Sequence, residues 1–182
     1  MRTFNEDLKL ETERLILRLI SEEDYLDLNK NIFSQEKVLR TFSSRQVELN
    51  DPSVVKSLAN RARESKTYIF SIILKEINQP IGIVLECSLP DHLHNSIELG
   101  YAIGEAFWNK GYTTEAVKKV IEFEFESDLH KIVITHFEGN KPSKRVIEKC
   151  GLTYEGTLKD DIFYHDSYHN VCYYGIINVN KK

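Results

Sequence analysis

A glycine-bearing turn in the middle of the chain carries the residues best suited to bind a ligand. It reads Phe107-Trp108-Asn109-Lys110-Gly111-Tyr112-Thr113-Thr114-Glu115-Ala116. The turn follows an apolar segment, 97–103, and precedes a segment in which Val117, Val120 and Ile121 share one face at helical spacing. Such a turn presents several unpaired backbone N–H groups to one point, and with the helix dipole they favour a bound phosphate. The sequence therefore predicts a phosphate-bearing ligand at this turn.

Strands and helices along the rest of the chain must position this turn. Apolar or alternating runs predict strands at 14–19, 68–77, 81–87, 97–103, 131–137, 153–164 and 168–177, with 131–137 buried on both faces. Asn78-Gln79-Pro80 predicts a hairpin turn between 68–77 and 81–87. Capping residues predict helices that begin at Ser21, at Asp51-Pro52 and at Asn140, besides the one after Gly111. This order predicts an α/β domain with a mixed central sheet of about six to seven strands, flanked by about four helices.

The composition is typical of one globular domain that spans residues 1–182. Hydrophobic residues make up 41% of the chain and charged residues 29%. The net charge of −4 argues against nucleic acid or an anionic membrane as the main partner. Residues 1–10 lack the apolar core of a signal peptide, and apolar runs such as 68–74 and 81–85 are too short to span a bilayer. We therefore expect a cytoplasmic protein.

Cysteine and histidine spacing predicts neither a disulfide framework nor a metal site. Cys87, Cys150 and Cys172 lie far apart in the sequence, without CxxC spacing. The histidines offer no pair at metal-ligand spacing, and surface or turn positions are expected for His92, His94, His136, His165 and His169. Cys150 falls on the apolar face of its predicted helix, which favours a core position over an acyl-cysteine intermediate.

Three segments of the chain share their order and spacing with a known protein family. They are 98–103 running into 108–116, then 140–151, then 154–160 followed by 168–171. Together with the opening 13–18 they resemble the GNAT superfamily of acyl-CoA-dependent N-acyltransferases, in particular its RimJ/RimL-like branch. The chain departs from the usual pattern of the phosphate turn. Trp108 stands where Gln or Arg is usual, and Thr113 where Gly or Ala is usual.

The resemblance implies that acetyl-CoA is the acyl donor and that the backbone of the turn holds its pyrophosphate. The cofactor-binding residues that it implies are Tyr101, Ala102, Ile103, Trp108, Asn109, Lys110, Gly111, Tyr112, Thr113, Thr114 and Asn140. Backbone groups from Gly100 to Ile103 would meet the pantetheine arm, and an N–H there would stabilise the developing oxyanion. Asn140 would contact the same arm or order a water. The alternative is that Asn140 only caps its helix.

The resemblance also implies two catalytic residues, Glu98 and Ser143. An amine with an ordinary pKa near 10.4 is mostly protonated at neutral pH, so transfer benefits from a base, direct or through water. Glu98 stands ten residues before Trp108, the offset at which histone-modifying members carry their catalytic glutamate. Ser143, in an Asn-x-x-Ser arrangement, would protonate the departing thiolate. The alternatives are an ion pair with a basic neighbour for Glu98 and an inert first-turn position for Ser143.

The predicted function is transfer of an acetyl group from acetyl-CoA to a primary amine, by direct attack in a ternary complex that uses no metal. A protein N-terminus, a small amine, a polyamine such as spermidine and an aminoglycoside-like antibiotic all stay open as acceptors. A non-catalytic acyl-CoA sensor is disfavoured because Glu98, Asn140 and Ser143 are all retained. A nucleotide-binding module is disfavoured because no Walker-type Lys-Ser/Thr follows the glycine.

The acceptor itself is not encoded in a recognisable motif. We expect it to be shaped by 31–63, which includes Arg40, Arg45 and Glu48, and by the turn at 164–168. Dimers are common among proteins that resemble this chain, so a homodimer stays an open alternative.

Overall fold

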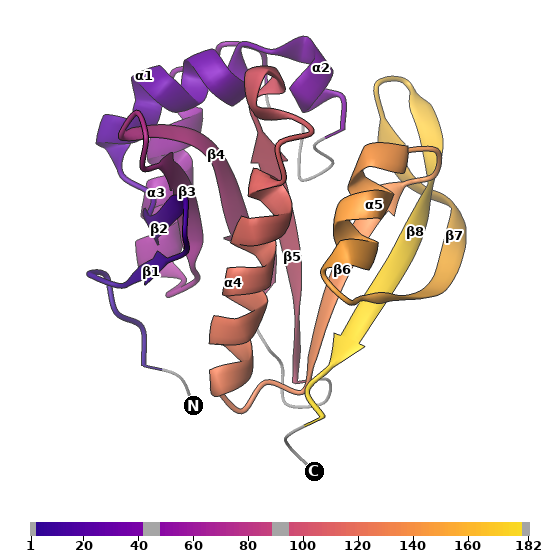
Figure 1. The fold of residues 1–182 in the computed structure, drawn as a ribbon. Helices are drawn as coiled ribbons and strands as arrows, with labels where there is room; N and C mark the ends of the chain where they lie inside the picture. Colours follow the sequence, from indigo (N-terminus) through magenta and orange to yellow (C-terminus); the bar gives the residue numbers. More distant parts are fainter. Residues whose placement is uncertain (1–2, 42–47, 89–94, 180–182) are drawn as a thin grey trace.

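The chain folds around one twisted, mixed β-sheet in a computed structural model that describes residues 3–41, 48–88 and 95–179 (Figure 1). The sheet runs in the order β1-β2-β3-β4-β5-β6-β8-β7. Its strands are β1 (Lys9–Glu11), β2 (Leu15–Leu19), β3 (Ile69–Leu74), β4 (Gln79–Glu86), β5 (Ser96–Ile103), β6 (Lys131–Phe137), β7 (Thr153–Tyr164) and β8 (Ser167–Ile177). The α-helices are α1 (Tyr25–Leu28), α2 (Glu36–Leu39), α3 (Val54–Glu64), α4 (Tyr112–Glu126) and α5 (Lys141–Lys149).

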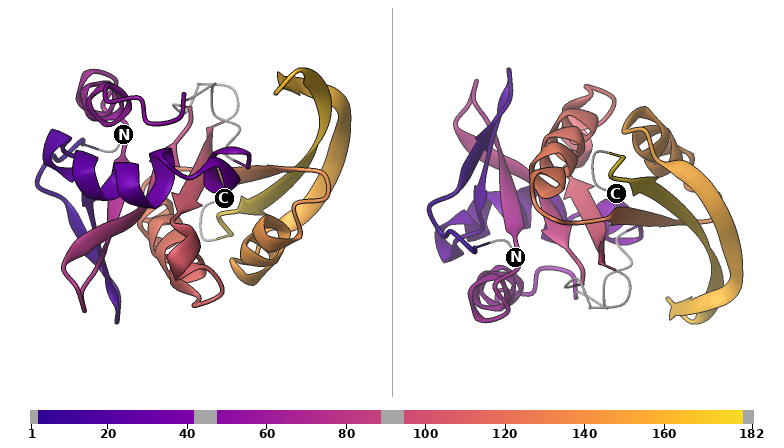
Figure 2. Two further views of the ribbon diagram at one scale, coloured as in Figure 1. Left: turned by 90° about the horizontal axis from the view of Figure 1, so that it is seen from above. Right: turned by 90° about the horizontal axis from the view of Figure 1, so that it is seen from below.

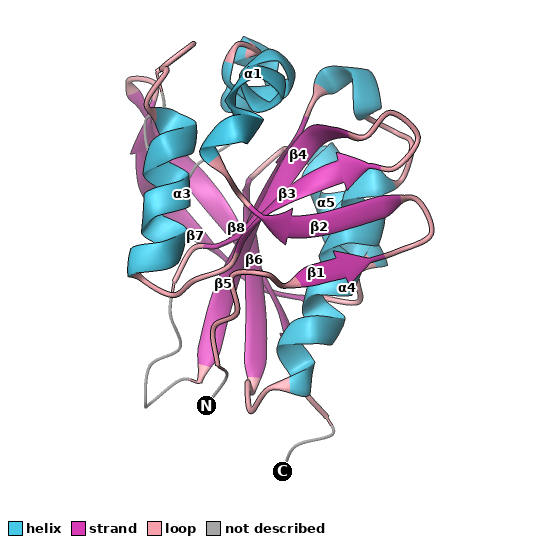
Figure 3. Cartoon of the chain, turned by 90° about the vertical axis from the view of Figure 1, so that its left-hand side faces the viewer, coloured by secondary structure: helices cyan, strands magenta, loops and turns pink. Residues whose placement is uncertain are grey.

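Helices cover both faces of the sheet, so its central strands are buried on both sides. Figures 1 and 2 show α4 and α5 on one face, α3 on the other, and the α1–α2 segment across one end. All six residues of β3 are buried, because α3 packs on one side of the sheet and α4 on the other. Figure 3 shows β3 between β2 and β4, which places it inside the sheet. The core is therefore continuous around β2, β3 and β4, and β5 is paired with β4 along its edge.

The strands β5 and β6 separate part-way along their length. Their parallel pairing covers only Ser96–Glu98 against Lys131–Val133. Beyond Glu98, β5 continues antiparallel to β4 as far as Ile103, and β6 continues antiparallel to β8 as far as Phe137. The two strands diverge toward the α1–α2 end of the molecule, with α5 near the opening (Figure 1). A gap between strands at the centre of a sheet is where a ligand can reach backbone groups.

The α/β class and the mixed sheet are confirmed, with three differences in detail. The sheet has one strand more than expected, because three-residue β1 is too short to show alternation. The extra helix is the single turn α2. The hairpin turn lies at 75–78, with Asn78 at φ +51°, and Gln79 and Pro80 already belong to β4.

The expectation that 131–137 is buried on both faces was wrong. The burial of β6 alternates between buried and half-buried residues. Ile132, Ile134 and His136 form its buried face, whereas Thr135 on the other face lines a cavity at the opening between the strands. The strand is half-covered because its neighbour β5 leaves it after Val133.

Candidate active site

The predicted phosphate turn is an open helix N-terminus. The chain leaves β5 through a short 3₁₀ turn at Glu105–Phe107, and then takes left-handed conformations at Asn109 (φ 59°) and Gly111 (φ 82°). Gly111 is the N-cap of α4 and supplies no side-chain hydrogen bond to the first helical N–H groups. A fifteen-residue helix therefore directs uncapped N–H groups and its positive dipole end toward one side of the turn.

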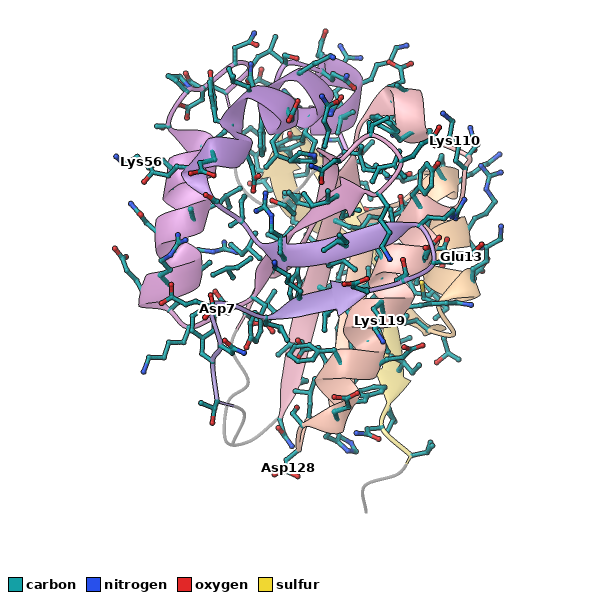
Figure 4. The ribbon with its side chains drawn as sticks, turned by 60° about the vertical axis from the view of Figure 1, so that its left-hand side comes forward. Asp7, Glu13, Lys56, Lys110, Lys119 and Asp128 are labelled. Carbon is teal, nitrogen blue, oxygen red and sulfur yellow. The ribbon has the colours of Figure 1, made fainter. Side chains whose placement is uncertain are left out.

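The turn is anchored by the loop between β1 and β2. Arg14 donates from Nη1 to the carbonyl of Lys110 at 3.0 Å and forms an ion pair with Glu115, whose Oε2 lies 2.6 Å from Nη2. Thr12 donates its hydroxyl hydrogen to the same carboxylate at 2.5 Å. Figure 4 shows Glu13 and Lys110 at the same corner of the molecule. Burial alone would raise the pKa of Glu115, but the bonds from Thr12 and Arg14 and the charge of Arg14 lower it overall.

A first cavity of about 360 Å³ lies against this helix N-terminus. It extends from the turn along the end of β5 to the first turn of α5. The predicted residues that line it are Tyr101, Ala102, Ile103, Trp108, Asn109, Gly111, Thr113, Thr114, Asn140 and Ser143. The side chains of two other predicted residues lie elsewhere. Lys110 sits over the Phe107 ring, with Nζ 5.7 Å from its centroid, and the buried Tyr112 ring lies 4.4 Å below the Arg14 guanidinium.

Every second residue of β5 turns its backbone N–H and C=O groups toward the gap between β5 and β6. The backbone carbonyl of Glu98 accepts a hydrogen bond from the N–H of Cys87, which directly follows β4, and the N–H of Gly104 donates to the carbonyl of Ile81. The even-numbered residues of this stretch therefore turn their backbone groups toward β4. Tyr101 and Ile103 lie between them and face the opening. The Trp108 indole donates to the Ile103 carbonyl at 2.9 Å, so this side chain fastens the turn to the strand end.

A second cavity, also of about 360 Å³, holds Glu98. Glu98 is the last residue of β5 that pairs with β6, and its Oε1 accepts a hydrogen bond of 2.8 Å from the hydroxyl of Thr135. Within the described residues, the side-chain partner of the Glu98 carboxylate is therefore a hydroxyl, whereas the alternative was a basic neighbour. The residues that line the cavity are Thr41, Arg61, Cys87, Glu98, Leu99, Gly100, Tyr101, Ile134, Thr135, His136, Ser143, Ile162 and Tyr173.

Comparison with known proteins decides the family. The family model of the acetyltransferase (GNAT) domain matches residues 14–153 of this sequence. The chain belongs to the GNAT acetyltransferases. Its relatives include the uncharacterized N-acetyltransferase YoaA of Bacillus subtilis, which is 27% identical over 92% of this chain and 96% of its own length.

Solved structures share the fold of this GNAT domain. A GNAT-family acetyltransferase from Bacillus anthracis superposes with a TM-score of 0.81 at 25% identity, over 94% of this chain and 99% of its own. RimL, a ribosomal-protein acetyltransferase solved in complex with coenzyme A, superposes with a TM-score of 0.82 at 17% identity, over 93% and 98% of the two chains. The resemblance inferred from the sequence is confirmed, and the protein is an acetyltransferase.

Three residues of the GNAT domain belong to both cavities. They are Thr41, Tyr101 and Ser143. The Tyr101 hydroxyl lies 2.7 Å from Ser143 Oγ and 3.2 Å from the Ser143 carbonyl oxygen. Asn140 caps α5, since its Oδ1 accepts from the Ser143 N–H at 3.2 Å, and it lines the first cavity as well. The capping role and a ligand-facing position therefore coexist at Asn140.

Sequence reasoning missed the partners that hold this site in place. Glu115 and Arg14 are separated by 101 residues, and Thr135 and Glu98 by 37, so no local pattern could pair them. Arg61 of α3 also lines the second cavity, where its Nη2 donates to the Glu86 carbonyl at 3.1 Å. Each of these contacts depends on how distant strands and helices are placed in the fold.

Tyr173 of β8 is a further residue of the second cavity that sequence reasoning missed. Its hydroxyl donates to Asp161 at 2.9 Å. Burial, helped by this bond, raises the pKa of Tyr173 to about 12. The phenol therefore stays protonated over the pH range in which an acetyltransferase works.

The three cysteines of the domain are free thiols. Burial raises the pKa of Cys150 to about 11, in the core position that the sequence predicted. Cys87 lines the second cavity, which was not expected. Burial and then the charge of Glu98 raise its pKa to about 12. A thiol held protonated in this way is a poor nucleophile, which supports direct transfer over an acyl-cysteine route.

One histidine is placed differently from the expectation. His136 is 6% exposed and lies on β6, so the surface or turn position expected for it was wrong. Its Nδ1 lies 2.7 Å from the Phe137 carbonyl, and its buried Nε2 has no hydrogen-bond partner within the described residues. His165 occupies an exposed turn, as expected. His92, His94 and Arg45 lie outside the described residues.

No group of three or more potential metal-ligating side chains occurs within 3–41, 48–88 and 95–179. Over the same ranges, no helix has the length and apolar character needed to cross a membrane.

Proposed function

We propose that this acetyltransferase transfers the acetyl group of acetyl-CoA to a primary amine by direct attack within a ternary complex. The observation that carries the proposal is the meeting of two cavities at Tyr101 and Ser143. One cavity has an anion-binding helix N-terminus, and the other has a carboxylate, Glu98. Donor and acceptor can therefore be bound at once, with their reacting atoms near Tyr101 and Ser143.

The first cavity suits the donor because its chemistry matches each part of acetyl-CoA. The N–H groups at the start of α4 suit the pyrophosphate, and the gap-facing backbone of Tyr101 and Ile103 suits the amides of the pantetheine arm. The structural neighbour RimL was solved with coenzyme A, which supports the same ligand class here. Trp108 and Thr113 differ from the residues usual in the phosphate turn of the family, but the proposed donors are backbone N–H groups, and a change of side chain leaves these in place.

The reaction follows from the groups at the junction. Glu98 takes a proton from the ammonium form of the acceptor, and the neutral nitrogen that results forms a bond to the thioester carbon. The carbonyl electrons move onto oxygen, where a gap-facing N–H such as that of Tyr101 stabilises the oxyanion. When the oxyanion collapses, the carbon–sulfur bond breaks, the thiolate receives a proton from the Ser143 hydroxyl, and the new amide nitrogen gives its extra proton to water. Glu98 and Ser143 then return to their starting states by proton exchange with water.

The second cavity favours a peptide N-terminus over a polyamine as the acceptor. Arg61 contributes a guanidinium to its wall and Glu98 a carboxylate. In a peptide N-terminus the amine lies next to a carbonyl oxygen, so the amine suits the Glu98 carboxylate and the carbonyl oxygen suits the positive charge of the Arg61 side of the wall. A polyamine would instead bring a second cation toward the guanidinium, and like charges at short range repel.

The test is an acceptor panel assayed for free CoA and for acetylated product by mass spectrometry. The panel contains peptides with free N-termini, the same peptides with blocked N-termini, spermidine and an aminoglycoside. We expect turnover with free N-termini and none with blocked ones. Acetyl-CoA binding in a calorimeter without turnover on any amine would overturn the proposal, as would the absence of acetyl-CoA binding.

The base is tested by Glu98→Gln, which keeps the size of the side chain but removes its charge. We expect kcat to fall by about 100-fold or more, with the KM for acetyl-CoA little changed. The matched control is Glu122→Gln on the exposed side of α4, where the carboxylate pairs only with Lys119 among the ion pairs of the described residues. A Glu98→Gln enzyme with the kcat and pH profile of the control would remove Glu98 as the base.

A further inference from the structure

The contact between Tyr101 and Ser143 joins a strand to the helix across the opening. Tyr101 lies on β5 and Ser143 in the first turn of α5, 42 residues later. Their side-chain oxygens are 2.7 Å apart, and both residues line both cavities. The Tyr101 side chain thus links β5, which is proposed to bind the donor, to the Ser143 hydroxyl, which is proposed to protonate the departing sulfur.

The phenol has a single hydrogen to donate, and its oxygen can also accept one. Burial raises the pKa of Tyr101 well above its usual range, so the hydroxyl stays protonated at any pH at which the enzyme works. Two acceptors are within reach, Ser143 Oγ at 2.7 Å and the Ser143 carbonyl oxygen at 3.2 Å. The 2.7 Å contact has the usual length of an O–H···O bond in which either oxygen can donate, so two arrangements of the hydrogens fit the geometry.

The choice of acceptor decides where the serine hydrogen points. If the phenol donates to Oγ, the serine cannot return its own hydrogen to Tyr101 and must direct it elsewhere, and both cavities open beside it. If the phenol donated to the carbonyl, the serine would donate to the phenol oxygen, and its hydrogen would point away from the sulfur. A hydroxyl hydrogen rotates to suit its partners, so the neighbour sets its direction.

We propose that Tyr101 is a positioning residue that turns the hydroxyl hydrogen of Ser143 toward the departing sulfur of coenzyme A. This inference rests on the proposed function, because it assigns Tyr101 a task in that reaction. Its side chain touches no reacting atom in this role and acts through Ser143. The benefit is an oriented donor in the transition state, with no need to reorganise the hydroxyl as the carbon–sulfur bond breaks.

A double-mutant cycle tests the proposal with Tyr101→Phe, Ser143→Ala and the two combined. We expect Tyr101→Phe to lower kcat by about tenfold with the KM for acetyl-CoA within about twofold of wild type. Ser143→Ala should lower kcat further. In the Ser143→Ala background, the loss of the phenol hydroxyl should have no additional effect, because the group that it orients is gone.

The matched control is Tyr68→Phe, which also removes one buried phenol hydroxyl. Tyr68 is 1% exposed, its hydroxyl accepts from the Asn5 N–H, and it lines neither cavity. Its loss should lower the melting temperature and leave kcat at the wild-type value. If Tyr101→Phe behaved like this control, the phenol would be structural and the proposal would be wrong.

Other outcomes separate this proposal from the proposed function. Losses in kcat that multiply in the combined variant would show that Tyr101 acts without Ser143, which overturns the positioning role alone. A fall confined to the KM for acetyl-CoA would assign Tyr101 to donor binding, which overturns it as well. Failure of the wild-type protein to acetylate any amine would instead remove the proposed function, and this inference with it.

Discussion

Thr135 of β6 donates its hydroxyl hydrogen to Glu98 of β5 at 2.8 Å, at the place where these two strands separate. The carboxylate is therefore held from the far side of the opening by a neutral partner. A hydroxyl places no opposite charge beside the carboxylate, as a basic side chain would. Such a contact orients the carboxylate toward the cavity that it shares with Arg61 and Tyr173.

Removal of the Thr135 hydroxyl should therefore impair catalysis more than folding. In Thr135→Val the shape of the side chain is kept, and we expect kcat to fall by about tenfold because the carboxylate loses its orientation. Thr135→Ser keeps the hydroxyl and should restore most of the activity. Equal activity of the Val and Ser variants in a CoA-release assay would show that the contact has no role in the reaction.

Alanine at Gly111 should weaken acetyl-CoA binding. The residue adopts φ +82°, a conformation that costs a non-glycine residue about 1–2 kcal/mol. Relief of that strain would shift the first N–H groups of α4, so we expect the Kd measured by calorimetry to rise about tenfold.

The control for this variant is Gly151→Ala, at the end of α5. Gly151 has a similar φ of +89° and does not line the first cavity. We expect a comparable loss of stability and an unchanged Kd. Equal effects of the two variants on Kd would mean that the α4 turn does not hold the phosphate.

The ion pair of Glu115 with Arg14 should make stability depend on pH. Because the pKa of Glu115 is lowered in the folded protein from its ordinary 4.5, the unfolded chain binds the proton more readily. The stabilisation is thus fully present above about pH 4.5 and is lost as the pH falls through the folded value.

The variant Glu115→Gln measures this contribution. At neutral pH we expect its free energy of unfolding to be lower than that of the wild type by roughly 1–2 kcal/mol. The difference should shrink in urea titrations at decreasing pH below about 4.5. A difference that stays constant over that range would assign the effect to packing and not to charge.

Replacement of Trp108 should weaken donor binding only modestly. The indole fastens the turn to the Ile103 carbonyl, but the phosphate is expected to be held by backbone N–H groups. We expect Trp108→Phe to raise the Kd for acetyl-CoA by about three- to tenfold, the equivalent of one hydrogen bond. A loss of more than about 100-fold would show that the indole itself contacts the ligand.

Local patterns in the sequence were sufficient for the elements of the site. The glycine before an amphipathic run predicts the turn and α4, and Asn140 followed by a proline predicts the start of α5. Both depend on neighbours within a few residues, through caps, helical periodicity and the freedom of glycine in the left-handed region. The family resemblance rests on the same local segments.

The sequence did not show which of these residues meet. Tyr101 and Ser143 are 42 residues apart, Thr135 and Glu98 are 37 apart, and Arg14 and Glu115 are 101 apart. Each pair depends on the register of the sheet and on the point at which β5 leaves β6. The half-open face of β6 lies at that same divergence, and His136 is buried on the opposite face of the strand.

The sequence by itself therefore determined the turn that is predicted to bind the donor, the order of the elements and the two residues predicted to be catalytic. Only the tertiary structure decided that Tyr101 and Ser143 join two cavities, and that Thr135 holds Glu98 at their edge. The reason is physical. Capping and periodicity are short-range properties of a chain, whereas a contact across a sheet depends on how all of its strands pack together.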